Sequence, residues 1–593
     1  MHGKLLKNVL VSVMVGILGC CPFVAPVRAT SLLTMPTLES TTLSLISANL
    51  VRDRGLETGF QDTFEGFHKR GRALVAADFD LDGRIDFFLG NDGDPSFVLR
   101  NVETPEGYQF EVAQKLLTAE PVFGAVAADF DNDGDYDLFV ANGGADHRGF
   151  DYLFQNTWME TGELQFVDVS EHSGIKGPIF QGQPLPTADV GVAVADYNRD
   201  GFVDIFVNVI EKFDLSSTDP LPQDGRNLLW HNNGDGTFTN VAEAVGLTAS
   251  VSNTTFSTFL DFDNDGDADL FENNYGQANV LWRNRLVETG VATFEDVTEA
   301  FSHLPDEDLR FPRWSFVSTA ADFNNDGWED IMLFSYASEP EPGSPYPLGH
   351  ALFLNQNGRG FKNVATAAGL NSPYAARNGV MGCQVGDLNG DGFPDVFLGN
   401  GGPKTGTRNY LFWSVPSPET PNGAPVRFAN VSDSIDFPAP KQKSLSYPPY
   451  PYRTHGTVFV DADNDGDLEI ASVNGGPFSY SNEVREPNRL FDFASSPSNF
   501  LKIQLVGDGV RVSRDAIGTR LALTLVSEDG TRRKIYRTLM GGSCFAAQNG
   551  FELLFDLSET ERVEQLEIRW PDGVEEIVDG DFLLNNLTIV ERS

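Results

Sequence analysis

"AADFDNDGDYDLFV", residues 127–140, places five aspartates at alternate positions of a nine-residue stretch, and an apolar run follows at once. Carboxylates held about 4 Å apart repel one another by about 4 kcal/mol per pair at an effective dielectric constant near 20. A bound cation would remove that repulsion. The stretch therefore predicts a cation-binding loop between two strands.

The same pattern, D-x-[DN]-x-D-G-x-x-[DE], occurs seven times, with starts 51 to 74 residues apart. Short runs rich in β-branched and aromatic residues flank every copy, which is typical of strands. Further runs follow in most repeats, so each repeat predicts roughly four strands. We call the copies loops 1 to 7; they are residues 78–86, 129–137, 196–204, 261–269, 322–330, 387–395 and 461–469.

These repeats predict an all-β protein. A single four-stranded sheet cannot bury both of its faces, whereas several sheets stacked around an axis can, and they leave only short edges. We therefore expect a seven-bladed β-propeller over residues 60–495. The run "FQDTF" (60–64) is expected to supply the fourth strand of the last blade and so to close the ring.

The loops predict calcium, because Ca²⁺ takes six to eight oxygen ligands in flexible geometry, whereas Mg²⁺ keeps more water. An EF-hand would need a glutamate at position 12 and flanking helices. Six of the seven loops lack that glutamate and strands flank them, so the EF-hand interpretation fails. The alternative without metal is a set of solvated turns.

We predict up to seven Ca²⁺ ions. The side chains at positions 1, 3, 5 and 9 and the backbone carbonyl at position 7 are the expected ligands, and the glycine at position 6 lets the chain turn. These positions are Asp78, Asp80, Asp82, Arg84, Asp86; Asp129, Asp131, Asp133, Asp135, Asp137; Asp196, Asn198, Asp200, Phe202, Asp204; Asp261, Asp263, Asp265, Asp267, Asp269; Asp322, Asn324, Asp326, Trp328, Asp330; Asp387, Asn389, Asp391, Phe393, Asp395; and Asp461, Asp463, Asp465, Asp467, Glu469.

The overall charge excludes some partners. Against 42 Lys and Arg stand 85 Asp and Glu, for a formal charge of −43. Such a chain repels nucleic acid and anionic membrane surfaces, so we expect no nucleic-acid partner.

The N-terminus resembles an export signal. Residues 1–29 begin with Lys4 and Lys7 and continue with an apolar run too short to span a membrane. Two processing routes stay open: cleavage after Ala29, or acylation of Cys20 within "ILGC" as a lipid anchor. Residues 30–59 read as a linker, and no other segment reaches membrane-spanning length. We expect a secreted or cell-envelope protein, extracellular or periplasmic.

Two cysteines lie outside this signal, Cys383 and Cys544. They fall in different predicted domains, and we expect them not to pair.

The seven loops resemble the FG-GAP/VCBS repeats that build the integrin α propeller, a resemblance that implies calcium binding by the loop aspartates. Residues 499–593 resemble the ASPIC/UnbV domain through "AIGTRL" (516–521), "GG" followed by "QN", and "IRWPDG" (568–573). The combination is similar to the cartilage acidic protein family, which implies secretion but no defined reaction. Apart from the resemblance, the alternating runs and the "PDG" turn predict a small β-sandwich with Trp570 in its core or at an interface.

The favoured function is a calcium-stabilised binding or adhesion module for an extracellular protein or carbohydrate. Its ligand would meet the strand-connecting inserts, which are residues 211–226, 302–314, 336–349 and 433–454 with "YPPYPY" (447–452). The alternatives are an enzyme that uses the propeller channel or the domain junction, and a structural envelope component. "GGSC" (541–544) lacks the G-x-S-x-G nucleophile pattern and is expected to be a turn.

Overall fold

The structure is a computed structural model. It describes residues 51–55, 57–60, 71–118, 120–144, 148–210, 226–247, 253–302, 308–311, 315–336, 350–370, 379–400, 409–415, 426–432, 454–475, 487–493, 499–578 and 582–592. The predicted export signal, Cys20, residues 30–50 of the linker, most of the four inserts and the "YPPYPY" run lie outside these ranges.

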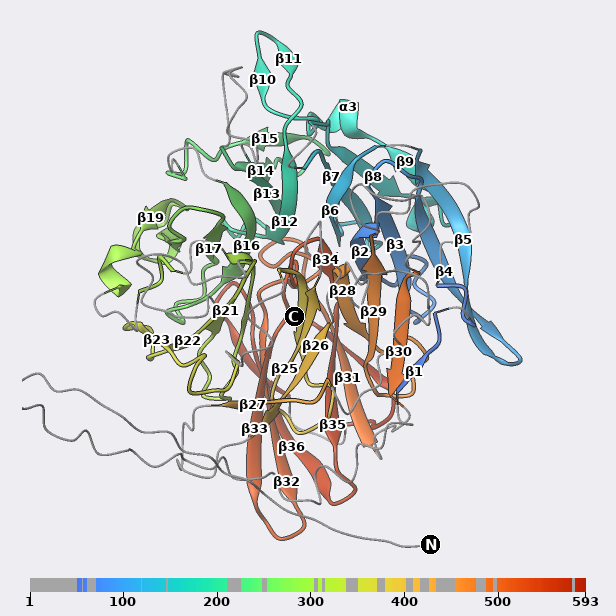
Figure 1. Cartoon of the computed structure of the whole chain (residues 1–593), viewed down its shortest axis with the longest axis vertical. Coiled ribbons are helices and arrows are strands. Elements are labelled where there is room, and N and C mark those ends of the chain that lie inside the picture. Colours follow the sequence, from blue (N-terminus) through green and yellow to red (C-terminus); the bar gives the residue numbers. More distant parts are fainter. Residues whose placement is uncertain are drawn as a thin grey trace, which may run out of the picture. The chain divides into compact units, whose positions relative to one another are not determined.

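Seven antiparallel sheets carry the repeat within this part of the chain, and each begins with the strand before an aspartate loop (Figure 1). Sheet 1 consists of β2 (Gly71–Ala77), β3 (Asp86–Asn91), β4 (Ser96–Thr104) and β5 (Gly107–Leu117), and sheet 2 of β6 (Val122–Ala128), β7 (Asp137–Asn142), β8 (Tyr152–Asn156) and β9 (Phe166–Asp168). Sheet 3 consists of β12 (Asp189–Ala195), β13 (Asp204–Val209), β14 (Leu228–Asn232) and β15 (Phe238–Asn240), sheet 4 of β16 (Thr254–Leu260), β17 (Asp269–Asn274), β18 (Val280–Asn284) and β19 (Phe294–Asp296), and sheet 5 of β20 (Ser315–Ala321), β21 (Asp330–Ser335), β22 (Ala351–Asn355) and β23 (Phe361–Asn363). Sheet 6 consists of β24 (Val380–Gly386), β25 (Asp395–Asn400), β26 (Tyr410–Val415) and β27 (Arg427–Asn430), and sheet 7 of β28 (Thr454–Val460), β29 (Glu469–Asn474), β30 (Arg489–Phe493) and β1 (Val51–Asp53).

The first strands of the sheets contact one another in sequence order. β2 touches β6, β6 touches β12, and the series continues through β16, β20 and β24 to β28, which contacts β2 again. These strands are rich in alanine, glycine and valine, and several are buried along their whole length. Small side chains allow such close packing of strands from different sheets. The arrangement is consistent with a β-propeller.

The beginning and the end of the repeat region meet in sheet 7, as expected, but the strand that pairs there is not the predicted one. β1 pairs antiparallel with β30, with Val51 opposite Phe493 and Asp53 opposite Phe491. The strand that pairs with β30 therefore comes from the predicted linker. The predicted closing run, residues 60–64, lies outside the described residues except for Phe60.

The C-terminal segment forms two further sheets. One has the order β35 (Glu552–Leu557), β31 (Asn499–Val506) and β38 (Leu587–Glu591), and the other β33 (Arg532–Thr538), β32 (Arg520–Ser527), β36 (Glu561–Arg569) and β37 (Glu575–Val578). Buried side chains of both sheets, among them Ile503, Leu523 and Leu566, belong to one apolar cluster. Trp570 is 1% exposed, as expected of a core aromatic.

The remaining elements are short. They are α2 (Trp158–Thr161), α3 (Ser170–Ser173), the hairpin of β10 (Ile179–Phe180) and β11 (Gln183–Pro184), α4 (Leu286–Thr289), the 3₁₀ turn η1 (Glu299–Phe301) and β34 (Ala547–Gln548). Among the described residues no helix has the length and apolar character needed to cross a membrane.

A segment of the C-terminal domain enters the ring of first strands. β34 lies parallel to β2, with Leu74 opposite Ala547. The Val194 N–H of sheet 3 donates to the Gly541 carbonyl oxygen at 2.7 Å, and the Ala127 N–H of sheet 2 donates to Gln548 Oε1 at 2.6 Å. We call residues 541–549 the plug. The turn was predicted only for its first four residues, 541–544; the plug reaches the first strands of several sheets.

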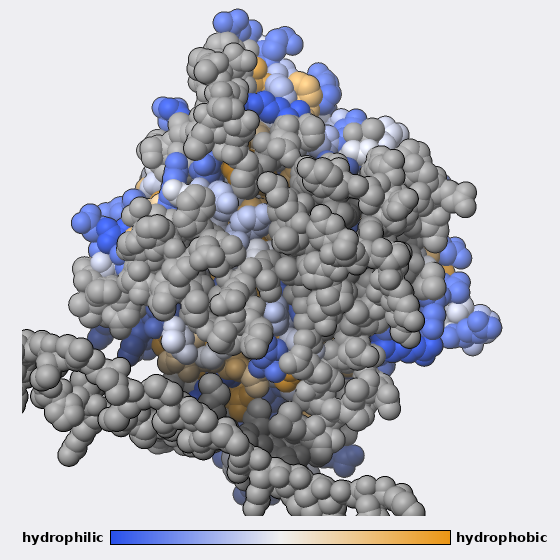
Figure 2. All heavy atoms as spheres, viewed as in Figure 1, coloured by the Kyte–Doolittle hydropathy of each residue, from blue (hydrophilic) through white to orange (hydrophobic). Residues whose placement is uncertain are grey.

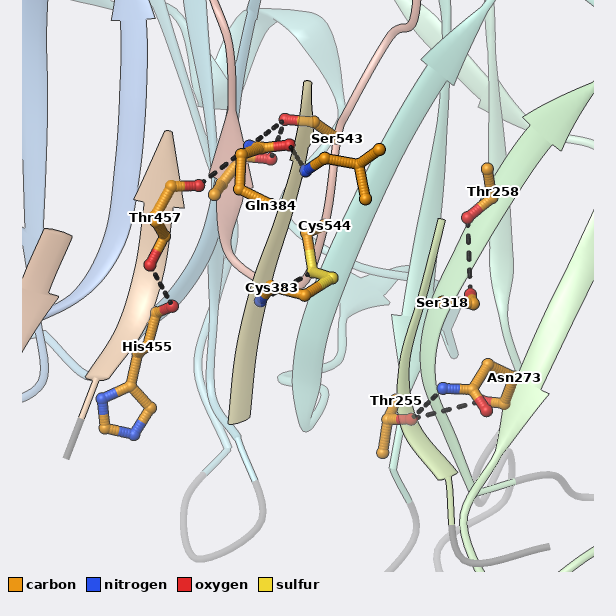
Figure 3. Close-up of a disulfide and its surroundings, with 12 residues drawn as sticks. Thr255, Thr258, Asn273, Ser318, Cys383, Gln384, His455, Thr457, Ser543 and Cys544 are labelled. Carbon is orange, nitrogen blue, oxygen red and sulfur yellow. Dashed lines mark hydrogen bonds between the residues drawn. A yellow bond between two sulfur atoms is a disulfide. The ribbon is translucent and has the colours of Figure 1, made fainter. Parts of the chain in front are cut away.

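A disulfide joins Cys544 of the plug to Cys383 of β24 (Figure 3). Beside it, Gln384 Nε2 donates to Ser543 Oγ at 3.2 Å and to Asn549 Oδ1 at 2.8 Å. The expectation that these cysteines stay unpaired is wrong, because it rested on their assignment to separate domains. The plug brings the two Cα atoms to 5.9 Å, which is within disulfide range.

We predict that this disulfide stabilises the whole fold. It closes a loop of 161 residues, and the loss of a native disulfide typically costs about 2–5 kcal/mol. Adding reductant should lower the melting temperature of the protein. The double variant Cys383→Ser, Cys544→Ser should melt at the lower temperature with or without reductant. Equal melting of oxidised and reduced protein would contradict the prediction.

Candidate metal centres in the aspartate loops

Each loop curls around the carboxylate at its first position. In loop 1, Asp78 Oδ1 accepts the Asp82 N–H at 3.0 Å and Asp78 Oδ2 accepts the Gly83 N–H at 2.7 Å. Loops 2, 3 and 5 repeat both bonds around Asp129, Asp196 and Asp322. The glycine at position 6 has a positive φ in all seven loops, from 83° to 109°, a backbone region that side chains disfavour.

The carboxylate at position 9 is buried and anchors two backbone donors. Asp137 Oδ2 accepts the Phe130 N–H at 3.2 Å and Asp137 Oδ1 accepts the Asn156 N–H at 2.9 Å. The other loops place Asp86, Asp204, Asp269, Asp330, Asp395 and Glu469 equally deep, all at 0% exposure. This position therefore fixes the loop to the third strand of its own sheet.

Asparagines connect consecutive loops from loop 7 through loop 1 to loop 6. In sheets 1 to 5 an asparagine of the third strand donates through Nδ2 to the position-2 carbonyl of the preceding loop; the pairs are Asn156 to Phe79, Asn232 to Phe130, Asn284 to Tyr197, Asn355 to Phe262 and Asn101 to Ala462. Position-4 asparagines donate to the glycine carbonyl of the following loop; the pairs are Asn132 to Gly201, Asn264 to Gly327, Asn325 to Gly392 and Asn464 to Gly83. The pairs Asn101–Ala462 and Asn464–Gly83 continue the series across the chain ends.

Carboxylate oxygens converge within several loops. One oxygen each of Asp78, Asp80 and Asp86 lies within 4.8 Å of the other two, and so do those of Asp129, Asp131 and Asp133, and of Asp261, Asp263 and Asp265. In loops 3 and 5 the position-3 asparagine donates to the position-5 aspartate, Asn198 to Asp200 and Asn324 to Asp326. The carboxylate and amide oxygens of these side chains are hard ligands of the kind that Ca²⁺ binds. Whether the position-7 carbonyls bind metal stays a prediction.

Several buried oxygens of these loops lack a hydrogen-bond donor among the described residues. They include Asp261 Oδ1, Asp387 Oδ1 and Asp463 Oδ1. An unsatisfied buried carboxylate oxygen is costly, and a cation would satisfy it.

Burial also changes the protonation of the loops. It raises the pKa of Asp78, Asp261 and Asp322 to about 7 each. Burial, with the Asp515 carboxylate beside it, raises the pKa of Asp129 to about 9. The empty loops therefore favour protonated carboxyl groups at neutral pH.

The C-terminal domain brings basic side chains to the first aspartates of four loops. Lys502 Nζ lies 2.6 Å from Asp461, and the guanidinium groups of three arginines lie close to the others, at 3.0 Å for Arg537–Asp387, 3.4 Å for Arg514–Asp129 and 3.6 Å for Arg569–Asp261. Sequence analysis missed these contacts. The only available signal was the run of basic residues at 532–537 next to acidic repeats.

The domain junction encloses a cavity of about 170 Å³, lined among others by Asp387, Asp461, Gln384, Lys502 and Asn549. Pockets for small-molecule ligands usually measure about 300–1,000 Å³, so this space suits a few waters better than a substrate.

Comparisons with known proteins agree with this description. A family described as "FG-GAP-like repeat" matches residues 78–140, 129–207, 212–272, 261–333 and 322–398, and one described as "ASPIC and UnbV" matches residues 509–592.

Cartilage acidic protein 1 of Mus musculus is 27% identical over 143 residues, 24% of this chain and 21% of that protein. Its counterpart in Xenopus tropicalis is 27% identical over 165 residues, 26% of this chain and 23% of the relative. Integrin alpha-3 of Cricetulus griseus is 33% identical over 87 residues, 13% of this chain and 7% of the integrin. The chain thus spans about a fifth or less of these relatives.

Among solved structures, the crystal structure of BBS1N in complex with ARL6DN, soaked with lead, aligns over 75% of this chain and 97% of that chain. Its TM-score is 0.35 at 10% identity, too low to support an argument.

The sequence families are decisive, because the repeat family covers more than half of the residues: the chain belongs to the FG-GAP-like repeat proteins and carries a C-terminal ASPIC and UnbV domain.

Proposed function

We propose that this protein is an exported, calcium-stabilised binding module, built as a seven-bladed propeller, for an extracellular protein or carbohydrate. The observation that supports it best is the chain of hydrogen bonds that connects loop to loop across the two chain ends. Seven acidic loops held in one series form a repeated site for calcium. The matched families and relatives agree with an extracellular binding role.

Strand direction decides where a ligand can bind. The aspartate loops join the first to the second strand of every sheet, so they share one end of the sheets. The connections from second to third strands and from one sheet to the next lie at the opposite end, because neighbouring strands are antiparallel. All four inserts belong to these connections. The C-terminal domain places its basic side chains at the loop end, whereas Phe545 of the plug packs against Phe316 at the start of β20.

The insert end exposes apolar side chains. Phe150, between β7 and β8, is 39% exposed, and Ile179 on β10 is 60% exposed. Figure 2 shows hydrophobic spheres at the top of the view, where β10 and β11 project in Figure 1. Exposed aromatic and aliphatic groups on connecting loops are typical of binding sites.

The alternatives are an enzyme that uses the propeller channel or the domain junction, and a structural envelope component. The plug, with its buried Phe545, Ala546 and Ala547, lies among the first strands of the sheets. No observation favours either alternative over binding.

Ligand binding is tested with glycan and peptide arrays probed with the exported protein in millimolar calcium. We expect binding to a defined ligand class, and the double variant Phe150→Ala, Ile179→Ala should weaken it. Double replacement of the exposed Val112 and Val574, which lie away from the insert end, is the matched control. Failure of every class to bind would contradict the proposal.

We predict that calcium removal destabilises the fold. An ion at ten times its dissociation constant stabilises a protein by about 1.4 kcal/mol, so seven sites contribute on the order of 10 kcal/mol. A chelator should lower the melting temperature strongly, and added calcium should restore it. Metal analysis of the dialysed protein should find up to seven calcium ions. An unchanged melting temperature would contradict the role of calcium.

The pH dependence should change sign with calcium. In the metal-free protein, carboxyl groups with pKa values near 7 keep protons that the unfolded chain releases above about pH 4. The free energy of unfolding should therefore fall as pH rises from about 5 to 8. With saturating calcium the folded loops are ionised, and stability should fall as pH drops instead. Melting curves in chelator and in calcium across this range test the prediction; parallel trends would contradict it.

A further inference from the structure

Loop 2 has a buried carboxylate that its own calcium site does not use. Asp135 occupies position 7, where only the backbone carbonyl is expected to bind metal. The side chain is 1% exposed. Its Oδ2 accepts the Met159 N–H at 2.8 Å, whereas its Oδ1 has no hydrogen-bond donor among the described residues. Asp133 Oδ2 nearby is equally without a donor. Buried oxygens of this kind point to a cation between them.

A glutamate from outside the loop completes the group. Glu160 lies on the short helix α2, just after the third strand of sheet 2. One oxygen each of Asp133, Asp135 and Glu160 lies within 4.8 Å of the other two. Asp133 also belongs to the group with Asp129 and Asp131. Asp133 is therefore common to both groups, and a carboxylate can bridge two neighbouring cations.

The sequence repeats this arrangement once. "NTWMETG" (156–162) follows the third strand of sheet 2, and "NRLVETG" (284–290) follows that of sheet 4. Asp265, Asp267 and Glu288 gather in the same way, and Asp267 Oδ2 accepts the Val287 N–H at 3.0 Å. Loops 3, 5 and 6 have Phe202, Trp328 and Phe393 at position 7 and lack the E-T-G sequence. Loop 7 has Asp467 at position 7 but no E-T-G sequence after the third strand of its sheet, so the acidic position 7 and the glutamate occur together only in sheets 2 and 4.

One difference between the two groups is the residue just before the third-strand asparagine. In sheet 4, Arg283 Nη2 lies 2.6 Å from Asp263 and 2.7 Å from Glu288. The equivalent residue of sheet 2 is Gln155, whose Nε2 donates to Asp131 at 2.7 Å and to Glu160 at 3.4 Å. Glutamine is neutral. Loop 2 with Glu160 has six carboxylates, and one divalent ion together with Arg514 leaves half of that charge uncompensated.

We propose that loop 2 holds a second divalent cation of the calcium type between Asp133, Asp135 and Glu160, and that Arg283 takes the place of this cation at loop 4. The inference rests on the proposed calcium binding of the loops. A hard cation with oxygen ligands and several waters matches the three carboxylates. The shared Asp133 makes loop 2 a two-ion site.

The test counts calcium ions by native mass spectrometry of the whole exported protein. Glu160→Gln should lose one ion relative to the unmodified protein, or bind it at least tenfold more weakly. Glu163→Gln is the matched control, because Glu163 is exposed in the same turn, carries the same charge and lies outside the group. Equal counts for Glu160→Gln and the unmodified protein would overturn the proposal.

A reciprocal exchange gives a second measurement. Gln155→Arg should remove the second ion from loop 2, and Arg283→Gln should add one at loop 4. Calcium counts that both exchanges leave unchanged would overturn the proposal. If the unmodified protein binds calcium and none of these variants alters the count, the second site fails and the proposed function stands. If the unmodified protein binds no calcium, the proposed function fails as well.

Discussion

The fold depends on a series of hydrogen bonds that runs from aspartate loop 7 through loop 1 to loop 6. Each third-strand asparagine reaches back to a carbonyl of the preceding loop, and each position-4 asparagine reaches forward to a glycine carbonyl of the next. These side chains are held because the position-9 carboxylate fixes the loop to its own sheet. Local loop geometry and the stacking of sheets are thus one constraint, and a distortion in one loop is transmitted to both neighbours.

The C-terminal domain uses the same end of the sheets. It brings Lys502 and three arginines to the first aspartates of four loops, and it inserts the plug among the first strands. Its basic groups partly compensate carboxylates that would otherwise repel one another. The disulfide then ties the plug to β24. The domain therefore belongs to the core of the protein and is more than an appended module.

The sequence predicts what is local and repeated. Strand runs, glycine positions and alternating aspartates all have a short period, so the sheets, the loops and their acidic groups could be identified without a structure. Contacts between distant segments have no such period. The pairing of Cys383 with Cys544, the arginines at the loops and the strand "VRD" at the closing edge each depend on how separate parts pack. Glu160 lies outside every loop, and only its repetition at Glu288 marks it.

The loops are not equivalent as cation sites, because their negative charge is compensated in different ways. Asp461 of loop 7 has Lys502 beside it, and Asp463 has Arg54 at 3.2 Å. Loop 3 has three carboxylates, two fewer than loop 7, and keeps His231 at 3.0 Å from Asp204. Loop 1 is different again. A methyl group placed on Gly83 would have no residue of the C-terminal domain within 4 Å. A methyl group on Gly134 would contact Arg514, one on Gly266 would contact Arg569, and one on Gly466 would contact Phe500. If the loops bind calcium as proposed, an ion at loop 1 would lack the cover that Arg514, Arg569 and Phe500 of the C-terminal domain give to the glycines of loops 2, 4 and 7.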